Sequence, residues 1–155
     1  MPVRTTLRQQ LFAAWSAVIE QDYRAQRVNS ERSLQASFWA QLNSILPTTT
    51  RRMFIEPRLS ICVDGLTKHR YPDIVICNSR NVVAVVELKY LPRTAPRYRK
   101  DIETLQLISR NRTGVRVANQ RHKGPTRDAR EYALGRDVLF VWAGVYRKRQ
   151  TAARS

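Results

Sequence analysis

Hydrophobic residues recur every three or four positions along the first third of the chain, which is the spacing of one face of a helix. A helix is predicted over about Thr5 to Arg27, with the stripe Leu7, Leu11, Trp15, Val18 and Ile19. A second helix is predicted to begin near Asn29 or Ser30, which are favourable N-caps, and to end before Pro47. Its stripe is Leu34, Phe38, Leu42 and Ile45.

From Met53 to Tyr90 the pattern becomes that of β-strands. The first strand is predicted in MFIEPRLSICV, with an interruption near Pro57, and DGLTKHR is interpreted as a turn. YPDIVIC predicts the second strand, NSRN a tight turn and VVAVVELKY the third strand. The segment LPRTAP then ends the sheet, because two prolines interrupt strand pairing.

The last third begins with a predicted helix in RYRKDIETLQLISR, whose core-facing residues are Tyr98, Ile102, Leu105 and Ile108. Residues 111–127 are basic and weakly patterned, and we interpret them as a long loop. A short helix is predicted from about Asp128 to Leu134, ending at Gly135. The final strand, DVLFVWAGVY, is apolar almost throughout, which is typical of a buried parallel strand.

This order of elements predicts an α/β fold with a mixed central sheet of about four strands flanked by helices. A hairpin is followed by a strand–helix–strand crossover, and the first helix is extra to this core. The 155 residues suit one domain, which we assign to residues 1–146, with the N-terminal helix in 1–28 and the core in 29–146. The basic segment 147–155 is predicted to be a disordered tail.

The charge of the chain favours a polyanionic partner. Lysine and arginine total 28 against 12 acidic residues, which gives a net charge of +16. Arginine dominates this excess, and its planar guanidinium binds phosphate through two parallel hydrogen bonds. Nucleic acid is the commonest partner of so basic a domain. The alternative explanations of this charge are that the protein needs it for solubility, or that its partner is an acidic protein or a membrane surface.

The two cysteines, Cys62 and Cys77, lie in apolar strand-like runs and are interpreted as reduced core residues. No stretch approaches the roughly 20 apolar residues of a membrane span. The segment MPVRTTLRQQ lacks the apolar centre of a secretion signal. We therefore expect a cytoplasmic protein that does not bind membranes.

Three charged residues are predicted to converge on the second and third strands. Alternate side chains of a strand share a face, so Glu87 and Lys89 point the same way, and the NSRN turn brings Asp73 beside them. Charges at the ends of apolar strands are costly unless something compensates for them. Magnesium can compensate for these charges, because it prefers a few carboxylate oxygens and accepts a substrate phosphate as a further ligand. A nearby lysine can stabilise negative charge that develops during the reaction.

The sequences Pro72-Asp73 and Glu87-Leu88-Lys89 resemble the PD-(D/E)XK signature of the restriction-endonuclease-like superfamily. The match covers the second and third predicted strands, and the element order over about residues 30–146 agrees with that family's core. The resemblance implies that Asp73 and Glu87 are metal ligands, that the Leu88 carbonyl is a third, and that Lys89 is the catalytic lysine. It also implies Mg²⁺, or alternatively Mn²⁺, as cofactor. The alternative is an ordinary hairpin with Glu87 and Lys89 at its surface.

Further candidates follow from the same resemblance. Many members carry another acid on the helix before the sheet, and Glu31 fits that position, although the helix dipole alone favours an acid there. Glu56 and Glu20 are weaker candidates for the same role. Relatives often use a residue of the helix after the motif, which makes Gln106 a candidate, and a solvated surface residue is the competing interpretation.

Two groups of basic residues are expected to contact nucleic acid. One opens the third helix, and the other lies in the basic loop, where so many cations would repel one another without an anion. The candidates are Arg97, Arg99, Lys100, Arg112, Arg116, Arg121, Lys123 and Arg127.

The predicted function is metal-dependent hydrolysis of phosphodiester bonds by an endonuclease, in DNA rather than RNA. A non-catalytic nucleic-acid-binding module on the same fold and a basic structural domain are the alternatives. Many small members of the superfamily are homodimers, and we assign such a contact to the N-terminal helix.

Overall fold

The computed structural model describes residues 5–147, except for the side chain of Asn119. The helical elements are α1 (Leu7–Ala17), the π-helix η1 (Val18–Tyr23), α2 (Glu31–Ile45), α3 (Arg99–Arg110) and the 3-10 turn η2 (Arg112–Gly114). The strands are β1 (Arg52–Ile55), β2 (Leu59–Val63), β3 (Leu66–Arg70), β4 (Ile74–Cys77), β5 (Asn81–Leu91), β6 (Val115–Lys123) and β7 (Thr126–Tyr146). Residues 148–155 of the predicted tail lie outside the described residues.

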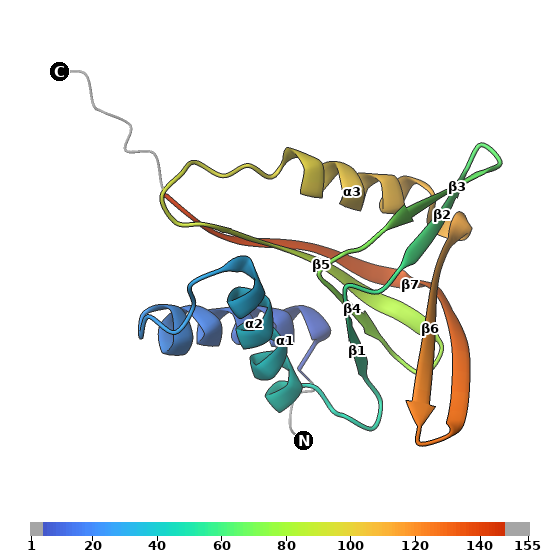
Figure 1. The fold of residues 1–155 in the computed structure, drawn as a ribbon, viewed down its shortest axis with the longest axis horizontal. Coiled ribbons are helices and arrows are strands. Elements are labelled where there is room, and N and C mark those ends of the chain that lie inside the picture. Colours follow the sequence, from blue (N-terminus) through green and yellow to red (C-terminus); the bar gives the residue numbers. More distant parts are fainter. Residues whose placement is uncertain (1–4, 148–155) are drawn as a thin grey trace.

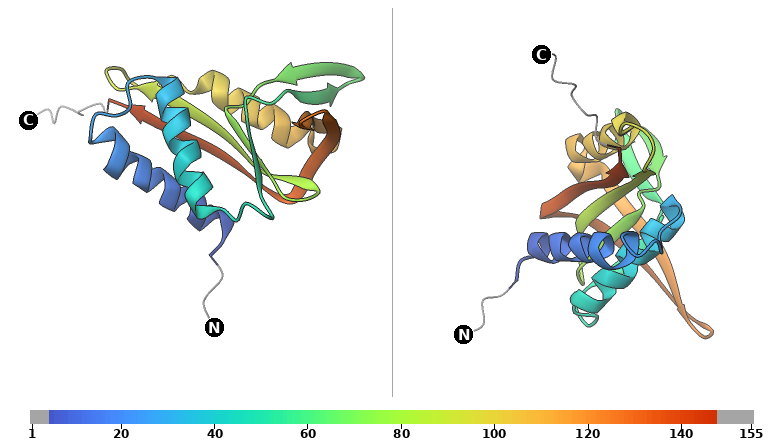
Figure 2. Two further views of the ribbon diagram at one scale, coloured as in Figure 1. Left: turned by 60° about the horizontal axis from the view of Figure 1, so that its bottom comes forward. Right: turned by 90° about the vertical axis from the view of Figure 1, so that its left-hand side faces the viewer.

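The two predicted N-terminal helices are confirmed. Elements α1 and η1 follow one another without a break, and Thr6 and Gln9 cap the start of α1 through reciprocal hydrogen bonds. Ser30 caps α2 by accepting a hydrogen bond from the backbone of Ser33. Figures 1 and 2 show α1 and α2 together on one side of the sheet and α3 on the other.

The sheet has seven strands in the order β1-β4-β5-β7-β6-β2-β3, and it is therefore larger than the four strands predicted. The predicted hairpin and the predicted parallel pair of strands at the centre of the sheet are confirmed. Strands β4 and β5 form the antiparallel hairpin, in which Ile74 pairs with Val86. Strands β5 and β7 are parallel and are joined through α3, in register from Val85 with Phe140 to Leu91 with Tyr146.

Two predictions for residues 53–70 need correction. In DGLTKHR only Asp64 and Gly65 make the turn, both with positive φ, and Leu66–Arg70 form β3 against β2. The single strand predicted over residues 53–63 is two strands, β1 and β2, which join different parts of the sheet. The predicted interruption near Pro57 is confirmed, and the chain changes its pairing partner there.

The predicted basic loop and the short helix after it are also wrong. They form a hairpin of β6 and the first part of β7 that turns at Gly124, where φ is +57°. Residues Thr126 to Ala133 pair with β6, and this pairing overrides the helix propensity of DAREYAL. The second part of β7 pairs with β5 instead. Figures 1 and 2 show the β6–β7 hairpin projecting from the body of the domain, and we call it the ribbon.

The core lies in two layers, one on each face of the sheet. On one face α1 and α2 bury side chains such as Phe38 against Ile76 and Val86. On the other face Ile108 of α3 packs with Val85 and its neighbours. The prediction of two core cysteines is correct for Cys77 but wrong for Cys62, which is exposed, and both are free thiols. Within residues 5–147 no helix is long and apolar enough to cross a membrane.

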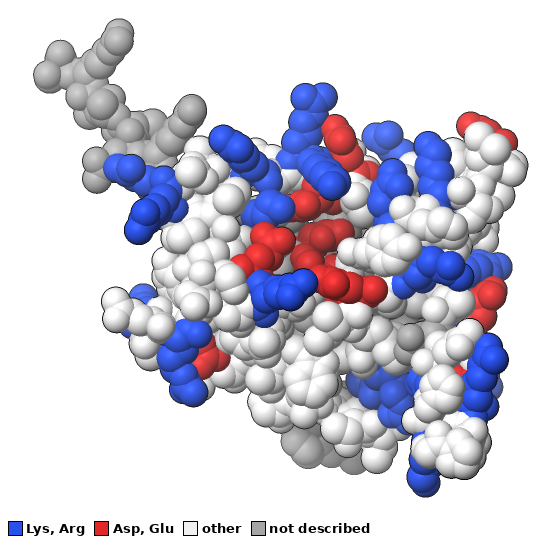
Figure 3. All heavy atoms as spheres, viewed as in Figure 1, with Lys and Arg blue, Asp and Glu red and all other residues white. Residues whose placement is uncertain are grey.

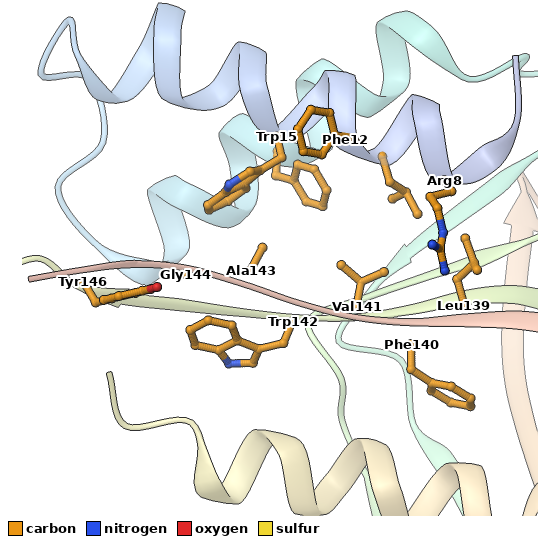
Figure 4. Close-up of a pocket in the computed structure, with 12 residues that line it drawn as sticks. Arg8, Phe12, Trp15, Leu139, Phe140, Val141, Trp142, Ala143, Gly144 and Tyr146 are labelled. Carbon is orange, nitrogen blue, oxygen red and sulfur yellow. The ribbon is translucent and has the colours of Figure 1, made fainter. Parts of the chain in front are cut away.

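The apolar stripe of α1 is buried inside the domain, so most of it is not available for a partner chain. Beside it lies an apolar hollow of about 510 Å³ between α1 and the end of β7. Figure 4 shows Val141 and Ala143 pointing toward α1, whereas Phe140 and Trp142 point to the opposite side. Phe12 of α1 is 73% exposed at this hollow. The homodimer contact remains a prediction.

Candidate active site

The end of the β4–β5 hairpin brings the two predicted acids together. Because Ile74 pairs with Val86, the preceding residue Asp73 lies across from Glu87. Their carboxyl groups are close enough to share a hydrogen bond. The second oxygen of Asp73, Oδ2, accepts a hydrogen bond of 2.6 Å from the backbone N–H of Leu88. Pairing of the two strands, as the alternation of side chains predicted, thus places both acids on one patch.

Strand β5 continues past the end of β4 and leaves a free backbone edge. Two carboxylates occupy the donors on this edge: Asp73 accepts from Leu88, and Glu31 accepts from the N–H of Tyr90 at 3.3 Å. The N–H and the carbonyl of a strand residue face the same neighbour, so the Leu88 carbonyl also lies on this edge. Glu31, the predicted acid of the preceding helix, therefore reaches the site from the first turn of α2.

The main chain of Asp73 is held from two sides. Its carbonyl accepts a hydrogen bond of 3.0 Å from Nε2 of Gln35, which is buried on α2, and another of 3.0 Å from the N–H of Glu56. Of the two weaker acidic candidates, Glu56 thus contributes its backbone, in a left-handed conformation with φ of +47°. Glu20 forms an ion pair with Arg24 on the surface of η1 and is not in the site.

Lys89 lies between two acids that come from different helices. Its Nζ atom is 3.8 Å from Oε2 of Glu31 and 3.5 Å from Oδ2 of Asp101. Asp101 was not predicted from the sequence. A signal for it was present, because Asp101 shares a helical face with Leu105 and Ile108, and an acid in line with buried residues requires a partner.

The packing of α3 on β7 fixes Asp101. The indole Nε1 of Trp142 donates a hydrogen bond of 3.3 Å to Oδ2 of Asp101. The Trp142 ring also packs against the rings of Tyr98 and Tyr146, with centroid distances of 5.6 and 6.1 Å. Gly144 makes room for this ring, since a Cβ atom there would come within 2.6 Å of it. Trp142 therefore holds a charged residue of the site in place.

Burial makes the acidic pair hard to ionise. Glu87 is 9% exposed, and burial, followed by the neighbouring charge of Asp73, raises its pKa to about 8. Burial also raises the pKa of Asp73, although the Leu88 N–H opposes this by stabilising the carboxylate. The pair therefore keeps a proton near neutral pH, and a cation bound beside it would release that proton.

The site opens into a cleft of about 680 Å³ between the sheet, α2 and α3. Figure 3 shows acidic side chains gathered in one hollow with basic side chains around them. The acids that line the cleft are Glu31, Glu87, Asp101 and Glu103, and the basic residues are Lys68, Arg70, Lys89 and Lys100. An anionic substrate would thus meet positive charge at the rim before it reached the acids.

The donors present suit magnesium better than a metal held wholly by protein ligands. Among the described residues no group of three His, Cys, Asp or Glu side chains is arranged to hold a metal ion. Magnesium commonly uses one or two carboxylates and keeps water or substrate oxygens as its other ligands. The half-buried carboxyl of Asp73 and the buried carboxyl of Glu87, with the Leu88 carbonyl beside them, meet that requirement.

The candidates on and before α3 divide into those at the cleft and those outside it. Lys100 lines the cleft, while Arg99 does not line it but forms an ion pair with Glu103, which does. Arg97 precedes the helix and is exposed. Gln106 is exposed and does not line the cleft, whereas Thr104, one turn after Asp101, does.

Most candidates of the basic segment lie on the ribbon. Arg116 pairs with Glu131 across the ribbon, and Arg121 pairs with Asp128. Lys123 and Arg127 are exposed next to the turn. Arg112 belongs to η2, where its guanidinium donates to the carbonyls of Gly135 and Arg136, so its role includes bracing the bend in β7.

No protein-family model, curated protein or solved structure matches this chain.

Proposed function

We propose that this protein is a metal-dependent nuclease of the PD-(D/E)XK type, which hydrolyses phosphodiester bonds in DNA rather than RNA. The observation that carries this proposal is a pair of adjacent carboxyl groups, the half-buried Asp73 and the buried Glu87, beside an open cleft that Glu87 and Lys89 line. An acidic pair with raised pKa values is costly unless it binds a cation or a proton, and such pairs are concentrated at functional sites. The resemblance of the motif to that superfamily supports the same function.

The proposed roles follow from the contacts. Asp73, Glu87 and the Leu88 carbonyl would hold Mg²⁺ or Mn²⁺, which when bound supplies positive charge that offsets the charge of the phosphate in the transition state. Lys89 directs a second positive charge into the same cleft. Glu31 and Asp101 hold the Lys89 ammonium in place from α2 and α3, so that little reorganisation is needed when the substrate binds.

The choice of a nucleic-acid substrate rests on charge and shape. The net charge of +16, the basic rim of the cleft and the projecting ribbon favour a long polyanion over a small phosphorylated molecule. A two-stranded β-ribbon fits the major groove of B-form DNA. Two free cysteines agree with a reducing compartment, and we place the activity in the cytoplasm.

A non-catalytic nucleic-acid-binding module is the second candidate, and one observation favours it. The charged groups of the site are bonded to one another: Lys89 to two acids, and Asp73 to a backbone N–H. Such a network can have a purely structural role, in which it stabilises the fold without taking part in catalysis. This candidate predicts salt-sensitive binding of nucleic acid with no cleavage in any divalent metal.

An incubation with nucleic acids of different geometry separates the two candidates. Supercoiled, linear, branched and single-stranded DNA are each mixed with the purified protein, with and without Mg²⁺, and in parallel with Lys89→Ala. The nuclease predicts cleavage that requires the metal and is lost in Lys89→Ala, while binding measured in EDTA persists. Cleavage that is equal in the variant, or absent from every substrate with Mg²⁺ and Mn²⁺, would overturn the proposal.

A further inference from the structure

A second, smaller pocket lies away from the acidic cleft, at the opposite end of β5. Its volume is about 270 Å³, and it forms where the ribbon meets the β4–β5 turn and the segment before β1. Six residues of strand separate Asn81 from Glu87, which corresponds to roughly 20 Å at the usual rise of about 3.3 Å per residue. The pocket is therefore distinct from the proposed catalytic site.

One face of the ribbon contributes most of the polar lining. Residues 128, 130 and 132 of β7 alternate along the strand and share this face, and Arg121 pairs with Asp128 from β6. The lining residues considered below are Arg52, Ser79, Arg121, Asp128, Arg130 and Tyr132. Three guanidinium groups thus face a single carboxylate, and the lining has a net positive charge.

Two donors in this lining are buried and have no partner among the described residues. Tyr132 is 1% exposed and packs on Phe54, yet its hydroxyl forms no hydrogen bond. The Nε–H of Arg121 is likewise buried and unpaired, although the other end of its guanidinium pairs with Asp128. A buried donor without an acceptor costs free energy, and most native structures satisfy it with water or a ligand.

The remaining cations are only weakly engaged. The contact of Arg130 with the Ser79 carbonyl is 3.4 Å long, near the limit of a hydrogen bond. Arg52 donates to the Thr48 and Arg51 carbonyls through one terminal nitrogen. A ligand that fits this lining must accept several hydrogen bonds, donate few, and carry negative charge.

We propose that this pocket binds one phosphate group. A tetrahedral phosphate offers several acceptor oxygens around one centre, which suits guanidinium groups and a hydroxyl that converge from different elements. The phosphate can belong to the backbone of a nucleic acid whose chain continues toward the acidic cleft, which rests on the proposed nuclease function. It can also be a free phosphate. The chemistry of recognition is the same for both.

The test is a titration of the full chain with inorganic phosphate in magnesium-free buffer at constant ionic strength. Binding is followed by the amide signals of Ser79 and Tyr132 in ¹⁵N-edited NMR spectra. Three variants are compared with the wild type: Arg130→Gln, Tyr132→Phe and the control Arg24→Gln. Arg24 is an exposed arginine that does not line the pocket, and its substitution makes the same change of charge as Arg130→Gln.

The proposal predicts one saturable site in the wild type and in Arg24→Gln. Arg130→Gln weakens binding about tenfold or more, because it removes a charged donor, and Tyr132→Phe weakens it about fivefold, because it removes a neutral one. Tyr132→Phe keeps or raises the melting temperature, since it deletes a hydroxyl that has no partner. Shifts that do not saturate, or equal affinity in all four proteins, would overturn the proposal.

Competition then identifies the source of the phosphate. A DNA duplex that displaces inorganic phosphate from Ser79 assigns the pocket to the nucleic-acid backbone, whereas simultaneous binding of both assigns it to a free phosphate. Neither result depends on cleavage, so failure of the nuclease assay leaves this measurement intact, and the reverse also holds.

Discussion

The Nζ atom of Lys89 lies 3.5 Å from Oδ2 of Asp101, although the two residues belong to strand β5 and helix α3. The same oxygen of Asp101 accepts a hydrogen bond from the Trp142 indole of β7. The position of the lysine therefore depends on the helix that connects the two parallel strands. In the proposed mechanism Asp101 is a positioning residue, because its carboxylate lies against the lysine ammonium.

Substitution of Asp101 separates its charge from its hydrogen bond. Asp101→Asn keeps an acceptor for the Trp142 indole but removes the charge that faces Lys89, so cleavage should fall tenfold or more while the free energy of unfolding changes by less than about 1 kcal/mol. Asp101→Ala should lose activity and about 1–2 kcal/mol of stability as well. Single-turnover cleavage and urea unfolding measure the two effects. If Asp101→Asn were as active as the wild type, the charge of Asp101 would have no role in cleavage.

The acidic pair predicts an unusual dependence of stability on pH. The pKa of Glu87 is about 8 in the folded protein and 4.5 for an ordinary glutamate. Between these values the folded state binds more protons than the unfolded state, so the free energy of unfolding should fall as pH rises from about 5 to about 8. The steepest slope for one proton is about 1.4 kcal/mol per pH unit. Urea unfolding in EDTA at several pH values measures it.

Glu87→Gln is the matched control, since it cannot ionise and has almost the same shape. Its stability should vary less with pH over this interval and exceed that of the wild type at pH 8. Mg²⁺ should raise the wild-type stability most at the alkaline end, where the pair is ionised, and should leave the variant nearly unchanged. A wild-type profile that rises with pH would show that Glu87 is not held in its protonated form.

A larger residue at position 144 should destabilise the protein while Trp142 is present. A Cβ atom at position 144 would lie 2.6 Å from the indole ring, so Gly144→Ala should destabilise the protein by about 1–3 kcal/mol and displace the ring from Asp101. The smaller ring of Trp142→Phe should reduce that cost, which a double-mutant cycle by urea unfolding would detect as a coupling energy. Additive costs would mean that the ring is not what limits position 144.

The ribbon should contribute to binding of nucleic acid independently of catalysis. Lys123→Ala and Arg127→Ala remove cations next to the turn that form no ion pair among the described residues. Each should lower the slope of log affinity against log salt by about 0.9 if it contacts one phosphate. Fluorescence anisotropy in EDTA measures binding, with Arg24→Ala as control. Equal slopes in all variants would place the bound duplex elsewhere.

Sequence patterns predicted the part of the fold that a hydrophobic core specifies. Strands β4 and β5 are apolar on both faces and end in charged residues, so the meeting of Asp73, Glu87 and Lys89 could be anticipated. Strand β3 and the outer part of the ribbon were missed because they are mostly solvent-exposed, and no alternation of apolar residues marks a segment without a buried face. Asp101 was missed because its partners, Lys89 and Trp142, are distant in sequence.

Magnesium-dependent cleavage by the wild type and Glu87→Gln tests the central claim most directly. A labelled duplex is mixed with excess protein under single-turnover conditions, with Arg24→Gln as a variant of unrelated position. We predict that the wild type and Arg24→Gln cut the duplex at the same rate, that EDTA stops both, and that Glu87→Gln binds the duplex with wild-type affinity but does not cut it. Cleavage by Glu87→Gln at the wild-type rate would contradict the assignment of this carboxyl pair to catalysis.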